Sequence, residues 1–553
     1  MFGWRNSRDL PLLGPPSALG LVLGAALFAL SLTPSLIPRT GILQGVLGGL
    51  CFAIGYLAGH TLVALYHWVL EREPPSSRQV RRTLRLAMPL AAALAGWGLW
   101  NVTGWQNGIH AAMGIPPVES ARPFTILAVA AVVAGVLIFL GRLFRRLWRV
   151  IAAQLERLLP RRLALAAGLL LAFLLFWSIG NDMMLRRALA GLDDAYAAID
   201  TLVSTDQPAP ADPLKSGSPA SLASWDGLGA EGRNWVLSSP DAAGIAAVTQ
   251  AAAVEPLRIY VGLNNAPTAE ARAKLALDEA LRVGAFDRAV LVVATPTGTG
   301  WMDPAGMQPL DYLTGGDVAT IGVQYSYLPS WMSLLLQPDY GSESAEAVFH
   351  AIYGHWRSLP PETRPRLFLF GLSLGARNGE FAATSPETLG DPVQGALWVG
   401  APFAASGWRQ VLAGRDPESP PWLPRFGDGS ILRVTTQGHE LDRAAAPWGP
   451  VRLVYLSYPS DPISYFSTDT PWRRPAWLKG DRGPDVSPGL QWVPVVTSLQ
   501  LVVDMMTATS PPPGRGHVYA ARDYLYAWDE VLGTETPPAR LAEIGRLLAD
   551  QGL

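Results

Sequence analysis

Five long apolar segments occupy the first third of the chain. They lie near residues 18–37, 42–66, 86–104, 123–141 and 163–180. A helix needs about 20 residues to cross the hydrocarbon core of a bilayer, and each segment is about that long. None of them contains Asp, Glu, Lys or Arg, which transporters usually keep inside the membrane for their substrate pathways. We therefore predict five transmembrane helices whose main task is to anchor the protein in a lipid bilayer.

The arginines predict the orientation of this anchor. Five of them lie between residues 72 and 85, after the second segment, and seven lie between residues 142 and 162, after the fourth. Short loops rich in Lys and Arg stay in the cytoplasm, so both loops are expected there. The loops after the first and third segments offer only Arg39 and Arg122. Everything after residue 182 is then expected outside the cytoplasm.

Residues 183–255 connect this anchor to the rest of the chain. Apolar residues recur every three or four positions between Leu185 and Val203, which predicts an amphipathic helix. Residues 204–240 are rich in Pro, Ser, Gly and Ala and read as an irregular linker. We therefore divide the chain into a membrane anchor (1–182), a connecting segment (183–255) and an outer domain (256–553).

The outer domain alternates between short apolar runs and longer helical patterns. The runs are continuous, as in parallel strands that are buried on both faces. The expected strands are Leu257–Val261, Arg288–Ala294, Val318–Gln324, Arg366–Phe370, Gln394–Val399 and Val451–Ser457. The expected helices are Thr268–Val283, Ser344–Leu359 and Ala376–Thr384. This order predicts an α/β fold with a mostly parallel sheet and helices on both faces.

Composition and charge separate the same two regions. The 553 residues are 49% hydrophobic and only 16% charged, which is unusual for a soluble protein. Residues 1–190 carry 18 arginines and 6 acids, whereas the remainder carries 25 basic and 39 acidic residues. The acidic outer domain argues against nucleic acid as a partner. Cys51 is the single cysteine, so no disulfide can form within the chain.

One pentapeptide carries the chemistry of the outer domain. Gly371–Gly375 has the pattern Gly-x-Ser-x-Gly, with an apolar strand before it and a helical pattern after it. This is the context of a nucleophile elbow, a sharp turn that presents a serine at the end of a strand. Ser373 is therefore the candidate nucleophile.

A serine nucleophile needs a base and an acid, and in this fold the chain order is serine, acid, histidine. Only His439 and His517 follow Ser373. Asp461 comes just after the last expected strand, so His517 has the right order and His439 is expected to be a surface loop residue. The acids that compete with Asp461 are Asp442, Asp469, Asp485 and Asp504.

The oxyanion formed during acyl transfer needs backbone N–H donors. One is expected from Leu374, the residue after the nucleophile. The second is expected from the Gly-rich loop after the strand that ends at Ala294, where the candidates run from Thr297 through Gly298 and Thr299 to Gly300. This loop lacks the Lys-Ser/Thr ending of a phosphate loop, and no cluster has metal-ligand spacing. We expect no cofactor and no metal.

The chain resembles Abhydrolase family 9, bacterial membrane proteins that join an N-terminal multi-helix region to a C-terminal α/β-hydrolase domain. The resemblance covers nearly the whole chain. It rests on five motifs, which occupy residues 284–288, 295–301, 371–375, 458–462 and 516–519. It implies a serine-hydrolase site on a membrane-anchored domain. Together with the orientation predicted from the arginines, it leads us to expect a bacterial inner membrane protein with its catalytic domain on the periplasmic side.

The expected activity is hydrolysis or transfer of an acyl group from a lipid-like or cell-envelope ester or thioester. Five tryptophans lie in the segments around Asp461, and they line an acyl pocket, sit at the membrane interface or belong to the core. They are Trp408, Trp422, Trp448, Trp472 and Trp477. Two alternatives remain open: a non-catalytic receptor or scaffold with a hydrolase fold, and a transporter with a regulatory outer domain.

Overall fold

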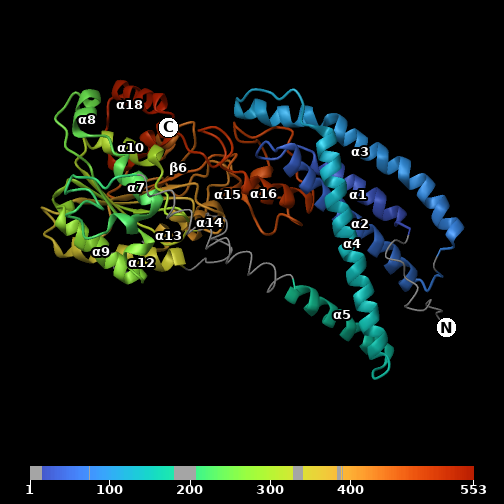
Figure 1. The fold of residues 1–553 in the computed structure, drawn as a ribbon. Coiled ribbons are helices and arrows are strands. Elements are labelled where there is room, and N and C mark those ends of the chain that lie inside the picture. The colour runs from blue at the N-terminus through green and yellow to red at the C-terminus, as the bar shows by residue number, and fades with distance from the viewer. Residues whose placement is uncertain (1–14, 74, 180–206, 328–339, 383–387, 389) are drawn as a thin grey trace. The chain divides into compact units, whose positions relative to one another are not determined.

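The computed structural model describes residues 15–73, 75–179, 207–327, 340–382, 388 and 390–553 (Figure 1). The chain divides into two compact units, which we describe separately. The N-terminal unit contains residues 1–192 and two later segments, 468–474 and 486–504. The α/β unit contains residues 193–467, 475–485 and 505–553.

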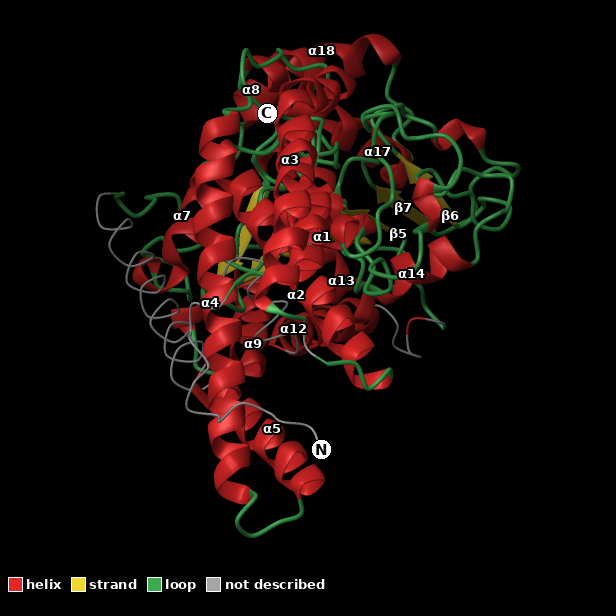
Figure 2. Ribbon diagram, turned by 90° about the vertical axis from the view of Figure 1, so that its right-hand side faces the viewer, coloured by secondary structure: helices red, strands yellow, loops and turns green. Residues whose placement is uncertain are grey.

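Four helices of the N-terminal unit are long and apolar enough to cross a membrane. They are α2 (Gly41–Val69), α3 (Ser77–Met113), α4 (Pro123–Leu155) and α5 (Arg161–Ser178). Figure 2 shows α4 and α5 as neighbouring helices joined by a short loop. These four agree with four of the five predicted spans.

The remaining predicted span, 18–37, is not confirmed. Helix α1 (Ala18–Ser31) has only 14 residues, which at 1.5 Å per residue is too short for a hydrocarbon core of about 30 Å. Pro34 and Pro38 explain this end, because proline lacks the N–H that a continuing helix would use. The apolar pattern runs on to residue 37, but the helix does not.

Glycines let the helices of the N-terminal unit approach one another closely. On α1 and α2, a Cβ added to Gly59 would lie 2.7 Å from the Cα of Gly20. On α2 and α4, a Cβ added to Gly45 would lie 2.7 Å from the Cβ of Val129. Small residues at four-residue spacing are the usual means of close helix packing in lipid. The glycines of α2 thus serve contacts with two different helices.

A helix from the C-terminal part of the chain completes this unit. Val496 and Val503 of α16 (Val496–Met506) form a buried apolar cluster with Leu47 and Cys51 of α2. The carboxylate of Asp504 accepts hydrogen bonds from the Ser35 hydroxyl and the Leu36 amide, both at 3.0 Å. It also lies 3.6 Å from the Arg39 guanidinium, and both side chains are fully buried. The N-terminal unit is therefore built from segments that lie far apart in the sequence.

The α/β unit is built on a parallel sheet of seven described strands in the order β1-β3-β2-β4-β5-β7-β6. The strands are β1 (Leu257–Val261), β2 (Val290–Thr295), β3 (Val318–Val323), β4 (Arg366–Leu372), β5 (Gly395–Val399), β6 (Leu432–Thr435) and β7 (Arg452–Leu456). All six predicted strands are present. Strand β6 was not predicted, because it has only four residues, lies at the sheet edge and is only partly buried in its first half.

Two groups of helices cover the sheet (Figure 1). One group contains α9 (Ala269–Arg282), α12 (Tyr340–Ser358), α13 (Leu374–Ala382) and α14 (Ser406–Ala413). The other contains α8 (Ala242–Thr249), α10 (Pro304–Leu313), α17 (Ala521–Leu532) and α18 (Pro538–Asp550). This confirms the predicted α/β architecture, with a core of strand residues between the two helical layers.

The expected linker over 204–240 is not irregular in its described part. A 3-10 helix (Trp225–Leu228) leads into α7 (Gly229–Leu237), and Trp235 of α7 is buried beside Tyr260 of β1. The Ser216 hydroxyl also accepts a hydrogen bond from the Tyr260 amide at 3.1 Å. These residues belong to the core of the α/β unit, although their composition resembles a linker. The predicted amphipathic helix of 185–203 lies outside the described residues.

Candidate active site

Ser373 lies at the carboxyl end of the central strand β4, in a strained conformation. Its φ angle is +57°, a region that residues other than glycine rarely adopt. Helix α13 begins at the next residue, Leu374, so the turn between strand and helix consists of the serine alone. The Ser373 amide donates to the carbonyl of Val399 in β5 at 2.9 Å, which fixes the turn to the neighbouring strand.

The two glycines of the motif are required by close backbone contacts. A Cβ on Gly371 would overlap the carbonyl group of Gly375, and a Cβ on Gly375 would overlap the carbonyl oxygen of Thr295. Thr295 ends β2, so Gly375 brings the elbow against the loop that follows β2. The strand, turn and helix expected of a nucleophile elbow are thus all present.

Asp461 and His517 form a buried pair. The His517 Nδ1 lies 2.7 Å from the Asp461 Oδ2, and the two side chains are 6% and 0% exposed. The same Oδ2 accepts the Tyr519 hydroxyl at 2.8 Å, while Oδ1 accepts the Ile463 amide at 2.9 Å and caps the short helix α15 (Pro462–Tyr465). With Nδ1 facing the carboxylate, Nε2 is the nitrogen that can accept a proton.

Ser373 and His517 both lie at the end of β5. The Ser373 amide bonds to Val399, and the next residue, Gly400, lies so close to the imidazole that a Cβ there would be 2.6 Å from the His517 Cε1. The parallel register explains this arrangement, because the ends of β4, β5 and β7 lie side by side. The described hydrogen bonds do not include one between the Ser373 hydroxyl and His517. Such bonds are often long without substrate and tighten when substrate binds.

The loop after β2 folds back on itself beside the elbow. The Thr297 amide donates to the carbonyl of Trp301 at 3.1 Å, and the Gly300 amide donates to the carbonyl of Thr297 at 2.9 Å. These two amides therefore already have partners within the loop. Gly298 and Thr299 form the tip of the turn between them.

The loop ends in a buried carboxylate, Asp303, which was not among the predicted site residues. Asp303 caps α10 through the Ala305 amide at 3.0 Å and accepts the Tyr524 hydroxyl at 2.8 Å. Burial raises the pKa of Asp303 to about 6. An Asp before Pro304 is a helix-start signal, which would have located the cap but not its tyrosine partner.

The other candidate acids have different partners. Asp485 accepts hydrogen bonds from Ser460 and Gln437, Asp469 pairs with Arg473, and Asp504 belongs to the N-terminal unit. Asp442 lies in a 3-10 helix over Leu441–Arg443. Among the described residues, Asp461 alone bonds to the His517 ring.

His439 lies in a loop and is partly exposed, as expected, but it has partners that the sequence did not indicate. Its Nε2 lies 2.8 Å from the Oδ1 of Asp523, a fully buried carboxylate, and its ring stacks on Tyr526 at 4.4 Å. The chain therefore holds a second histidine–aspartate pair. The neighbouring pairs are linked by tyrosines: Tyr458 donates to Asp523 and stacks on Tyr519, which donates to Asp461.

The tryptophans around Asp461 divide between core and surface. Trp408 and Trp477 are buried and pack against Tyr465. The guanidinium groups of Arg433 and Arg452 lie 3.9 Å and 5.7 Å from the centre of the Trp448 ring. Trp422 donates to the carbonyl of Asp481, and Trp472 is exposed. At least three of the five therefore have structural roles.

This combination of a parallel sheet, a strained serine at a nucleophile elbow and a following Asp–His pair defines the α/β-hydrolase class. Two family models agree with this geometry. The model described as alpha/beta-hydrolase family matches residues 257–543, and the model described as alpha/beta-hydrolase family N-terminus matches residues 32–240. The chain belongs to this family, Abhydrolase family 9. No curated protein and no solved structure gives a match.

Proposed function

We propose that this protein is a membrane-anchored serine hydrolase that cleaves or transfers an acyl group of a lipid-like or cell-envelope ester or thioester. The observation that carries the proposal is the positive φ of Ser373 next to the buried Asp461–His517 pair. A protein that only binds its ligand has no need for a strained serine between two glycines that permit no side chain. This favours an enzyme over a receptor or scaffold.

In the proposed reaction, the Ser373 hydroxyl attacks the acyl carbonyl and His517 Nε2 takes its proton. Asp461 holds the ring through Nδ1 and stabilises the imidazolium that forms. The protonated His517 then gives the proton to the leaving alcohol or thiol, which leaves the acyl group on Ser373. Water or a second alcohol, activated by the same His517, releases the acyl group and completes hydrolysis or transfer.

The oxyanion of the intermediate is assigned to backbone donors beside the elbow. Leu374 is the first residue of α13, and the first N–H groups of a helix have no partner within it. The second donor is assigned to the loop after β2, which Gly375 brings against the elbow, with Thr297, Gly298 and Thr299 as the candidates.

The anchor supports the proposed substrate class. Four helices are long and apolar enough to cross a membrane, and the spans predicted in the sequence carry no ionised residue for a transport pathway. A hydrolase held there meets substrates that carry an acyl chain. The proposed location is a bacterial inner membrane with the α/β unit on the periplasmic side.

This orientation does not depend on whether α1 crosses the membrane. The arginine-rich loops after α2 and α4 are both assigned to the cytoplasm, so α5 emerges on the opposite side in either case. Alkaline phosphatase fused after Leu553 should be active, and the same reporter fused at residue 159 should be inactive. The reverse pattern would contradict the location.

Covalent labelling tests the enzyme itself. A fluorophosphonate probe should modify the full chain at Ser373, and Ser373→Ala should remove the modification. A screen of acyl esters and thioesters that compares the wild type with Ser373→Ala then identifies the substrate. A folded wild-type protein that neither reacts with the probe nor cleaves any ester would contradict the proposed function.

A further inference from the structure

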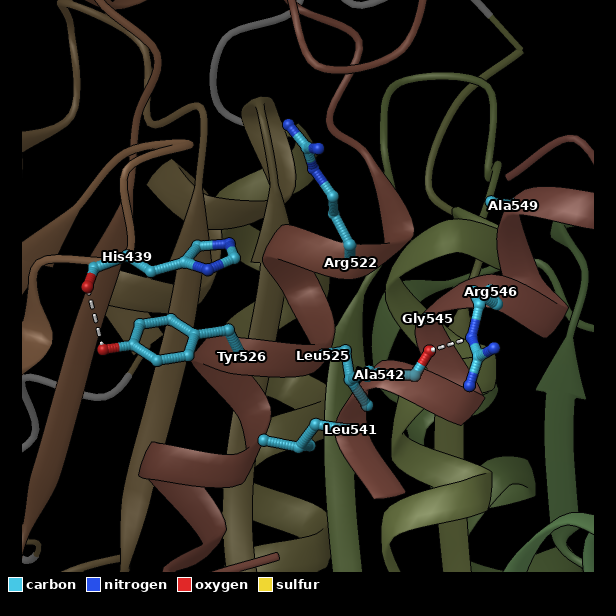
Figure 3. A pocket seen from close by; sticks show the side chains of 9 residues that line it. All are labelled: His439, Arg522, Leu525, Tyr526, Leu541, Ala542, Gly545, Arg546 and Ala549. Atoms are coloured by element: carbon cyan, nitrogen blue, oxygen red, sulfur yellow. Dashed lines mark hydrogen bonds between the residues drawn. The ribbon is translucent and has the colours of Figure 1, made fainter. Parts of the chain in front are cut away.

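A cavity lies in the α/β unit, at the edge formed by α17, α18 and the loop after β6 (Figure 3). Its volume is about 370 Å³, near the lower end of the range for small-molecule sites. Leu525 and Tyr526 come from α17, Leu541 and Gly545 come from α18, and His439 comes from the loop. None of these residues belongs to the candidate active site.

One wall of the cavity is rigidly built around His439. Its ring stacks on Tyr526 with an angle of 16° between the planes, and the Tyr526 hydroxyl donates to the His439 carbonyl at 3.0 Å, as Figure 3 shows. Its Nε2 is held by Asp523. Its backbone has a φ of +57°, so these contacts maintain a conformation that is costly for histidine. A merely exposed loop histidine would not need three such restraints.

Cationic side chains stand at the rim of this apolar cavity. Arg522 and Arg546 both line it, and both are exposed. The Arg522 Nε lies 3.3 Å from Asp523, which already accepts from His439 and Tyr458. The Arg546 Nε donates to the carbonyl of Ala542, and within the described part of the chain Arg546 has no acidic partner. The residues that line the cavity therefore include two arginines and no carboxylate.

We propose that this cavity binds a carboxylate that carries a single apolar chain. The chain would lie against Leu525, Leu541 and the ring of Tyr526. The carboxylate would lie at the rim, where a guanidinium can bind both of its oxygens. The volume suits one medium-length chain and is too small for a lipid with two long chains. Binding of a carboxylate in this cavity does not depend on the proposed hydrolysis at Ser373.

Gly545 offers a way to fill the cavity without strain. A Cβ at this position meets only the Cδ2 of Leu525, at 3.9 Å, and leucine is a better helix former than glycine. Gly545→Leu should therefore fold and occupy the space of the chain. Gly354 on α12 is a matched control, because nothing lies within 4 Å of its Cβ position and it does not line the cavity.

The test uses the full chain carrying Ser373→Ala in phosphatidylcholine nanodiscs, so that no turnover occurs. A photoreactive decanoate should crosslink to peptides within 521–549, and Gly545→Leu should lower this crosslinking at least about fivefold while Gly354→Leu leaves it unchanged. Arg546 is exposed, so Arg546→Gln should not disturb folding. This variant should reduce crosslinking by the photoreactive decanoate more than crosslinking by the matching photoreactive decanol.

Either of two results would overturn the proposal. Equal crosslinking in Gly545→Leu and Gly354→Leu would show that the cavity is not the site. Equal crosslinking by decanol and decanoate would show that the site does not select a carboxylate. Because Ser373 is absent in every arm, failure here is distinct from failure of the hydrolase assignment.

Discussion

Two histidine–aspartate pairs of the α/β unit have nearly the same length and different surroundings. His517–Asp461 spans 2.7 Å, and His439–Asp523 spans 2.8 Å. The His517 side chain is 6% exposed and lies against Gly400 at the carboxyl end of the sheet, where Ser373 also bonds. The His439 side chain is 35% exposed, stacks on a tyrosine and borders a cavity. A histidine–aspartate distance alone therefore does not identify a catalytic base.

What separates the pairs is the group that each imidazole can reach. His517 lies beside the end of the strand to which the nucleophile elbow is bonded, whereas His439 follows β6 at the edge of the sheet. The two stacked tyrosines Tyr458 and Tyr519 connect the two carboxylates. Because only His517 lies beside the elbow, variants of the two pairs should affect labelling and turnover very differently even though the tyrosines connect them.

The largest effect is expected from Ser373→Ala. Without the hydroxyl no covalent bond can form, so fluorophosphonate labelling should disappear and ester turnover should fall by about 10⁴-fold or more. Mass spectrometry of the labelled protein and a turnover assay measure the two effects. Retention of labelling would place the nucleophile elsewhere.

His517→Ala should come next, with a different signature. The hydroxyl remains but its base is gone, so labelling should become much slower rather than impossible. The time course of labelling, followed to completion, distinguishes slow reaction from none. A labelling rate equal to that of the wild type would remove His517 from the proposed triad.

Asp461→Asn should preserve the packing and lose the charge that holds the imidazolium. In a well-studied triad this change costs on the order of 10⁴ in turnover, and we expect at least about 10² here. Turnover at saturating ester measures it. A silent variant would remove Asp461 from the proposed triad.

Tyr519→Phe removes one hydrogen bond to the Asp461 carboxylate and leaves the His517 contact in place. Burial raises the pKa of Tyr519 well above its usual value, so its hydroxyl remains a donor across the working pH range. We expect turnover to fall by about two- to tenfold, consistent with the loss of one charge-assisted bond. A loss as large as that of Asp461→Asn would mean that the tyrosine does more than orient the acid.

The smallest effect on labelling is expected from His439→Ala. This variant removes one partner of the buried Asp523, which keeps Tyr458 and Arg522. The expected cost is about 1–3 kcal/mol of folding stability, measured by chemical denaturation. The fluorophosphonate labelling rate should remain at least about 10²-fold above that of His517→Ala. Equal losses in the two variants, with both proteins folded, would show that chain order has misassigned the base.

Local sequence signals predicted the core of the site and of the sheet. Gly371, Ser373 and Gly375 form a contiguous signal, because the close contacts of the elbow exclude side chains on both sides of the serine. Continuous apolar runs predicted six strands, since both faces of a central parallel strand are buried. The order serine, acid, histidine then selected Asp461 and His517, which the structure brings into contact.

The contacts between residues that are far apart in the sequence were decided by the tertiary structure alone. Helix α16 and Asp504 were assigned by sequence to the outer domain, but they pack with α2 and Arg39, more than 400 residues away. The partnership of His439 with Asp523 likewise joins residues that no local pattern relates. The apolar run over 18–37 suggested a full span, whereas the prolines after Ser31 end the helix. Hydrophobic pattern determined which residues are buried, but the partner of each buried charge depends on contacts that form only when distant segments pack together.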